Sequence, residues 1–209
     1  MVVLPGSAAG CGTAGSGVGV ARRVREGVPA DVLVLAEDAP VKLAAEGHLV
    51  PGTVRPLWAS QVVAAVPAGS PVPALDSESD LQAALLAAER IAYSTGPSGT
   101  ALVELTARLG LAGRIGHRLV QTPPGVPVGS LLAAGGADLA FQQQSELTGL
   151  PGVVVVGPLP GDAAISSTFG GAVLVASAEP HRATEVLDLL GSDAASRIAR
   201  AGGMRPARP

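Results

Sequence analysis

Residues 91–104 read IAYSTGPSGTALVE, a short apolar run that breaks into small polar residues and then resumes with helical spacing. The apolar run is typical of a buried strand, and the residues from Thr100 onward are typical of a helix. The connecting Ser-Thr-Gly-Pro-Ser-Gly has two interpretations, and the stretch alone leaves both open. It is either a turn whose Ser and Thr side chains cap the helix, or a cradle for an anion at a helix start, where backbone N–H groups favour negative charge.

The same alternation of strand and helix extends outward in both directions. The run ADVLVLAED at residues 30–38 has the length of a strand and no polar face, which indicates a parallel sheet covered on both sides. Further strands are expected at 60–68, 90–95, 118–123, 137–144, 153–159 and 171–177, with helices at 20–27, 41–50, 79–89, 100–111 and 128–136 and two more after 181. This order predicts an α/β fold.

The composition limits the class of partner. The chain has 209 residues, of which 47% are hydrophobic and 15% charged, enough for one domain or two small lobes. With a net charge of -3, 2% aromatic residues and no basic stripe, we expect no nucleic-acid partner. The single Cys11 cannot form an internal disulfide, and no Cys/His cluster has metal-ligand spacing. We therefore expect no metal and no cofactor.

The ends and loops carry no targeting or nucleotide motif. The sequence shows no apolar stretch of about 18 residues and no basic segment followed by an apolar one, so it predicts neither a membrane span nor a signal peptide. If the start is native, the chain is expected in the cytoplasm. The Gly-rich residues 10–19 lack the Lys-Ser/Thr pair of a phosphate-binding P-loop.

Four stretches together resemble a known family. They are GVPADVLVLAEDAPVKLAAEGHLVPG at 27–52, RIAYSTGPSG at 90–99, PPGVPVGSLLAAGGADLAFQQQSEL at 123–147 and PGVVVVGPLP at 151–160. In order and spacing they resemble the periplasmic molybdate-binding proteins and their relatives among the type II solute-binding proteins of ABC transporters. The resemblance covers nearly the whole chain.

This resemblance implies two α/β lobes with mixed, mostly parallel sheets, joined by two crossing strands, with the ligand held in the cleft. Lobe one would combine residues 1–61 and 149–209, and lobe two would be 62–148. The chain departs from the family by apparently lacking its first strand and helix, and the loop at 10–17 is longer than usual.

The resemblance also implies how the ligand is held. In the family, Ser hydroxyls and backbone N–H groups bind an oxyanion without a metal. The matching positions, expected to bind the ligand, are Ser16, Thr95, Ser98, Gly99, Val128 and Gln143. Gln143 stands where the molybdate binders place a Tyr, and a Gln side chain both donates and accepts, which suits carboxylates as well. The expected ligand is molybdate, tungstate or a carboxylate.

Simpler interpretations stay open at several positions. Ser98 and its Ser and Thr neighbours would serve only as helix caps, and Ser16 would lie in a loop without a ligand. The amides of 142–144 end a strand, so alternate members face opposite sides. His48, His117 and His181 are expected at the surface, and the acidic pair at 37–38 in a solvated turn.

Three functions compete. The first is a periplasmic or extracytoplasmic binding protein that captures a small anion for an ABC permease. The second is an enzyme on the same scaffold, because some proteins that resemble this family isomerise aconitate. No catalytic residue is predicted, since no His or Lys falls on a matched position, so whether the chain is an enzyme stays open. The third is a truncated product that binds nothing.

Overall fold

The chain folds into two compact units, each with strands, helices and hydrophobic cores of its own. The structure is a computed structural model that describes residues 3–4, 17–36, 38–123 and 126–207. Unit 1 comprises residues 1–59 and 167–209, and unit 2 comprises residues 60–166. Both units combine strands and helices, so the α/β class predicted from the sequence is confirmed.

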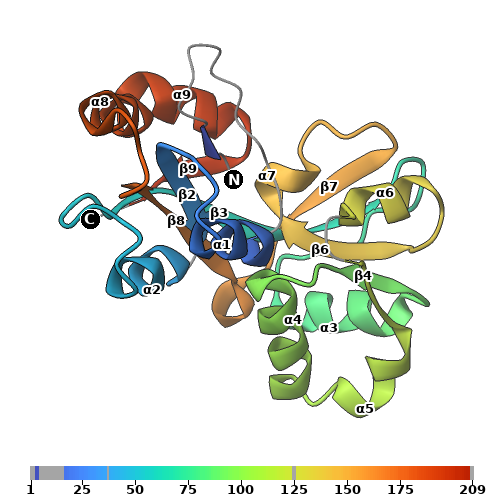
Figure 1. The fold of residues 1–209 in the computed structure, drawn as a ribbon. Helices are drawn as coiled ribbons and strands as arrows, with labels where there is room; N and C mark the ends of the chain where they lie inside the picture. Colours follow the sequence, from blue (N-terminus) through green and yellow to red (C-terminus); the bar gives the residue numbers. More distant parts are fainter. Residues whose placement is uncertain (1–2, 5–16, 37, 124–125, 208–209) are drawn as a thin grey trace. The chain divides into compact units, whose positions relative to one another are not determined.

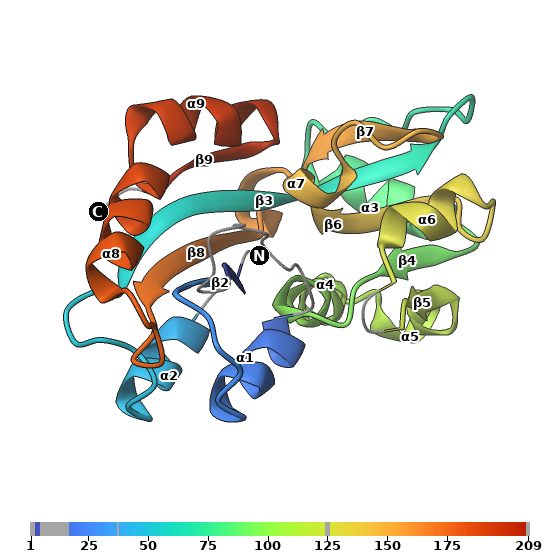
Figure 2. The ribbon, with the colours of Figure 1, turned by 45° about the horizontal axis from the view of Figure 1, so that its top comes forward.

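Unit 1 is built around strand β2, which pairs antiparallel with β1 and with β8. Helices α1 and α2 lie on one side of these strands and α8 on the other (Figures 1 and 2). The strands are β1 (Val3–Leu4), β2 (Val32–Ala36), β8 (Ser166–Val173), the first residues of β3 (Arg55–Pro67) and β9 (Met204–Pro206). The helices are α1 (Gly17–Arg25), α2 (Ala39–Ala45), α8 (Pro180–Leu190) and α9 (Asp193–Ala201).

The antiparallel pairing of β2 differs from the parallel sheet expected for this apolar run. Leu33 and Leu35 pack with α1 and α2, whereas Val32 and Val34 pack with α8. Two helical layers therefore cover the strand, and this explains the lack of a polar face. Burial on both sides requires apolar residues along a strand, but it does not determine whether the neighbouring strands run parallel or antiparallel to it.

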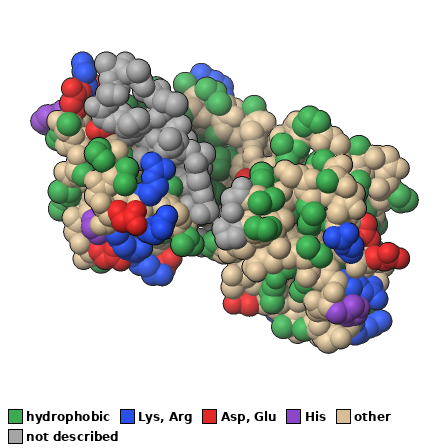
Figure 3. Space-filling view, turned by 45° about the vertical axis from the view of Figure 1, so that its right-hand side comes forward, with side chains coloured by type: hydrophobic (Ala, Val, Ile, Leu, Met, Phe, Trp, Pro, Cys, Tyr) green, Lys and Arg blue, Asp and Glu red, His purple; other side chains and the backbone are tan. Residues whose placement is uncertain are grey.

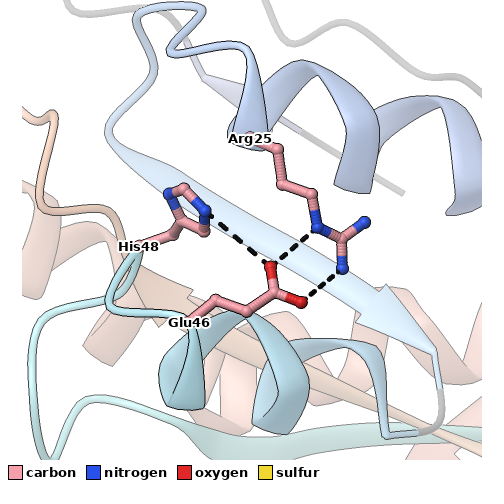
Figure 4. A network of polar contacts seen from close by, with 3 residues as sticks. All are labelled: Arg25, Glu46 and His48. Atoms are coloured by element: carbon pink, nitrogen blue, oxygen red, sulfur yellow. Dashed lines mark hydrogen bonds and ion pairs between the residues drawn. The ribbon is translucent and has the colours of Figure 1, made fainter.

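A polar network joins the ends of α1 and α2 at the surface of unit 1 (Figure 4). Arg25 donates from Nε and Nη2 to the two carboxylate oxygens of Glu46 at 2.7 and 2.8 Å. The hydrogen bonds and charge of this guanidinium hold the pKa of Glu46 below its usual range. His48 Nε2 lies 3.8 Å from the same carboxylate and is only partly exposed. His117 and His181 are exposed, as expected.

Unit 2 carries a mixed sheet in which β4 runs parallel to β5 and β6, while β3 runs antiparallel to β6 and β7. One core lies between the sheet and α3, α4 and α5, and another lies between the sheet and α6 and α7 (Figure 1). The strands are β4 (Ile91–Tyr93), β5 (Leu119–Gln121), β6 (Leu139–Gln143) and β7 (Val153–Pro158). The α-helices are α3 (Glu78–Ala87), α4 (Pro97–Arg108), α5 (Ala112–Ile115), α6 (Val128–Ala133) and α7 (Gln144–Leu147), and the short 3-10 helices are η1 (Gly116–Arg118) and η2 (Gly161–Ala163).

The division of the structure into units differs at one place from the lobe boundaries expected from the sequence. The first lies between residues 59 and 60, close to the expected 61, but the second lies between 166 and 167 instead of near 149. Residues 149–166 stay in unit 2 because β7 pairs along β3, from Pro67 opposite Val153 to Val63 opposite Pro158. A strand held along its whole length by a neighbour belongs to the sheet of that neighbour.

The charged side chains are scattered over the surface. Figure 3 shows Lys and Arg in small separate groups on the face that it draws, interspersed with acidic side chains. Among the helices that the structure describes, none is long and apolar enough to cross a membrane.

Candidate functional site

The candidate site lies in unit 2, at the edge where the parallel strands β4, β5 and β6 end. Tyr93 lies opposite Gln121 in β5 and opposite Phe141 in β6, so the three strands reach this edge together. The N–H and the hydroxyl of Thr122 both donate to the carbonyl oxygen of Tyr93, at 2.9 and 3.3 Å. The carboxyl ends of parallel strands are where α/β folds commonly bind ligands.

The start of α4 brings two hydroxyl groups together. The helix begins at Pro97, a residue favoured in the first helical position, and its N-cap is Gly96, which supplies no side-chain cap. Ser98 is buried, and its Oγ lies 3.1 Å from Oγ of Ser94. The interpretation of Ser98 as a helix cap is therefore wrong. Thr95 lies exposed in the preceding bend.

Gly99 is placed in the first turn of α4, but its amide is already used. Its N–H donates to the carbonyl oxygen of Gly96 at 3.0 Å. A side chain at Gly99 would overlap with the carbonyl oxygen of Ser94. In this structure Gly99 therefore allows close packing of the helix on the end of β4, whereas the sequence predicted a donor to the ligand.

The start of α6 is held by a side chain of β6. The buried N–H of Val128, expected to donate to the ligand, donates instead to Oε1 of Gln142 at 3.1 Å. Nε2 of Gln142 in turn donates to Oε2 of Glu146 in α7. Only 4% of Gln142 is exposed, so its carboxamide is fixed between a backbone amide and a carboxylate.

Gln142 and Gln143 face opposite sides of the sheet, as the period of a strand requires. Phe141 packs in the core that contains α4, and Ala140 packs in the core that contains α6. Gln143 follows Phe141 by two positions and belongs to the α4 side, where it is buried and lies opposite Val62 of β3. Gln142 lies on the α6 side.

Glu146 is the acidic group of this edge. The residue as a whole is exposed, but its carboxyl group is enclosed by the surrounding protein, and this desolvation raises the pKa of Glu146 above its ordinary value. Sequence reasoning named Gln142 only as one of the three amides 142–144 and missed Glu146. The two residues are four positions apart in QQQSEL, a spacing that brings side chains together within a helix. Here this spacing crosses the end of a strand, and it was the only feature of the sequence that pointed to their contact.

A second pair of hydroxyls fixes α7, the short helix that carries Glu146. Oγ of Ser60, a residue of β3 that is 1% exposed, lies 3.3 Å from Oγ of Ser145. No motif in the sequence indicates this contact, because the two residues are 85 positions apart. Ser60 thus helps to place Glu146 beside the end of β6.

Two further expectations concern unit 1 and the metal. Ser16 and Glu37 lie outside the described residues, and the neighbouring Asp38 forms an exposed ion pair with Lys42 at 2.6 Å. Across the described ranges, no three His, Cys, Asp or Glu side chains come together in a way that would hold a metal ion.

Comparison with known proteins shows the family of this chain. The family model described as bacterial extracellular solute-binding protein matches residues 12–205. An aconitate isomerase of Pseudomonas sp. is 30% identical over 187 residues, which cover 90% of this chain and 71% of the isomerase.

Two solved structures show the same fold. The periplasmic molybdate-binding protein of Azotobacter vinelandii superposes with a TM-score of 0.76 at 22% identity, covering 94% of this chain and 86% of its own. The sulfate-binding protein SubI of Mycobacterium tuberculosis superposes with a TM-score of 0.71 at 19% identity, covering 93% and 75%. With the family match extending over nearly all of its residues, this chain belongs to the bacterial extracellular solute-binding proteins.

Proposed function

We propose that this protein captures a small oxyanion or carboxylate at the carboxyl edge of β4, β5 and β6, outside the cytoplasm, and delivers it to an ABC permease. The observation that carries the proposal is the start of α4. Ser98 is buried there, yet its hydroxyl pairs with that of Ser94 and caps nothing. Two hydroxyls beside the start of a 12-residue helix suit an anion, because the N-terminal end of a helix dipole favours negative charge.

Membership of the solute-binding family supports this role, and the molybdate- and sulfate-binding proteins with the same fold support an anionic ligand. Candidates are molybdate, tungstate, sulfate and small carboxylates. Of the positions expected to bind the ligand, Thr95, Ser98 and Val128 lie around this edge, together with Gln143 at the end of β6.

Titration calorimetry of the full chain against these anions tests the proposal. We expect at least one of these anions to bind. Ser98→Ala should lower the affinity for that anion by about 10- to 100-fold, because a hydrogen bond to a charged group is lost. Ser70→Ala is the matched control: Ser70 follows β3, far along the chain from this edge, and its variant should bind as the wild type does. A folded wild-type protein that binds none of the anions would contradict the proposal.

An isomerase of a small polycarboxylate is the second candidate, and Glu146 favours it. Moving a double bond between carbons of such an acid needs a group that removes one proton and returns another. Burial raises the pKa of Glu146 towards the range where a carboxyl group can do both, and the relative from Pseudomonas is an aconitate isomerase.

Proton NMR in D2O with cis- and trans-aconitate tests this second candidate. We expect the wild type to interconvert the two acids with deuterium incorporation, and Glu146→Gln to lose the conversion while still binding. Unchanged spectra with wild-type protein would exclude the activity.

A further inference from the structure

The carboxamide of Gln142 accepts the backbone N–H of Val128, the donor that an oxyanion at the start of α6 would need. Oε1 of Gln142 accepts the buried N–H of Val128 at 3.1 Å, and Nε2 donates to Glu146. An oxyanion that bound to the Val128 amide would have to displace Oε1. Because Gln142 is 4% exposed, water does not readily replace the lost partner, and a buried carbonyl oxygen without a donor is disfavoured.

The orientation of this carboxamide is fixed from its other end. Glu146 is a pure acceptor when ionised, so it selects the NH2 group of Gln142 and turns Oε1 towards Val128. Flipping the amide would set its oxygen against a carboxylate. Glu146 therefore keeps Gln142 in the orientation in which its Oε1 accepts the N–H of Val128, so that this N–H is not available to a ligand.

Glu146 also places a negative charge beside the site, one carboxamide away from the Val128 amide. Any ionised ligand at this position is repelled by that charge, and a fully deprotonated tetrahedral anion has no hydrogen-bond donor to offset the repulsion. A ligand that carries a hydroxyl or a protonated carboxyl group can instead donate to Glu146. As a residue Glu146 is exposed, so a ligand can approach it, although the surrounding protein withdraws its carboxyl group from bulk water.

The two sides of the edge therefore differ in chemistry. Ser94 and Ser98 offer hydroxyl donors on the α4 side, whereas Glu146, bonded to Gln142, offers an acceptor on the α6 and α7 side. We propose that Gln142 and Glu146 are specificity residues, which exclude dianionic tetrahedral oxyanions and select an organic anion that carries a hydrogen-bond donor, such as a hydroxycarboxylate. This inference rests on the proposed anion site and narrows its ligand class.

Calorimetry of the full chain at about pH 8, where carboxyl groups are ionised, tests the inference with four probes. Citrate and propane-1,2,3-tricarboxylate differ only by a hydroxyl group, and molybdate and sulfate represent the tetrahedral dianions. We expect citrate to bind about 10-fold or more tighter than each of the other three, the ratio that one hydrogen bond to a charged group provides.

Glu146→Gln removes the charge and frees the carboxamide of Gln142 to turn. We expect this variant to bind molybdate and sulfate about 10-fold tighter and to lose the preference for citrate over its hydroxyl-free analogue. Glu104→Gln, the same change at an exposed position of α4, should leave all four affinities as they are in the wild type. Circular dichroism establishes that each variant is folded.

The outcomes separate this inference from the proposed function. Equal or tighter binding of molybdate or sulfate by the wild type, or unchanged ratios in Glu146→Gln, would overturn the specificity role and leave the anion site standing. Absence of binding by every anion tested would overturn both.

Discussion

The α-carbon of Gly99 packs directly against the carbonyl oxygen of Ser94. A Cβ at Gly99 would overlap with that oxygen and lie 3.0 Å from the ring of Tyr93. Gly99 is part of an ordinary helical turn, so it is the available space and not an unusual backbone angle that demands glycine here. This close approach holds the first turn of α4 on the end of β4 and brings the hydroxyls of Ser94 and Ser98 together.

Gly99→Ala should therefore damage both stability and binding. The added methyl group must push the backbone of Ser94 away, and overpacking of this kind costs about 1–3 kcal/mol. Urea denaturation measures the loss, and calorimetry should show weaker anion binding. Gly113→Ala in α5, where a Cβ would meet nothing within 4 Å, should leave stability unchanged or slightly higher. Equal stabilities for the two variants would refute the packing role.

The turn after β4 was the part of the site that the sequence predicted best. A strand followed by Gly-Pro-Ser-Gly leaves few alternatives, because Pro starts helices and small residues allow close packing. The helix was expected from Thr100 and begins three residues earlier, at Pro97, so that Ser98 and Gly99 lie in its first turn. The local chain alone decided this geometry.

Contacts between distant segments could not be predicted in the same way. The alternation of a strand shows that Gln142 and Gln143 face opposite sides, but not that α6 and α7 pack on the side of Gln142. The link from Val128 through Gln142 to Glu146 depends on that packing. For the same reason the antiparallel neighbours of β2 were not predicted. An apolar run indicates that a strand is buried, but the direction of its neighbours depends on strands far along the chain.

Asp138 fixes the beginning of β4, at the opposite edge from the candidate site. Its carboxylate accepts the N–H groups of Glu89 and Arg90, each at 2.7 Å. In Asp138→Ala both N–H groups would bond to water instead of the carboxylate. At this exposed position we expect the free energy of unfolding to fall by about 1 kcal/mol and the anion affinity to stay unchanged. Asp162→Ala, at an exposed position of the 3-10 helix η2, serves as the control and should have no effect on urea denaturation. A stable Asp138→Ala protein would show that the two bonds do not hold the strand.

Glu146 should make the protein less stable as the pH rises. Burial raises the pKa of this carboxyl group above its ordinary value of 4.5, so between the unfolded and the folded pKa the folded chain binds more protons than the unfolded chain. The stability that this group contributes is therefore fully present below the unfolded pKa and is lost as the pH rises through the folded one. Glu146→Gln removes the titration and keeps the shape of the side chain.

We expect the melting temperature of Glu146→Gln, relative to that of the wild type, to increase as the pH rises above the ordinary carboxyl pKa and to level off once the carboxyl group is ionised in the folded protein as well. Thermal melts followed by circular dichroism across this range measure the difference. Glu104→Gln again provides the matched control, because this residue lies on the exposed face of α4, and its melting temperature should follow that of the wild type. A constant difference between Glu146→Gln and the wild type at every pH would mean that the carboxyl group of Glu146 is fully hydrated, and that its bond to Gln142 does not withdraw it from water.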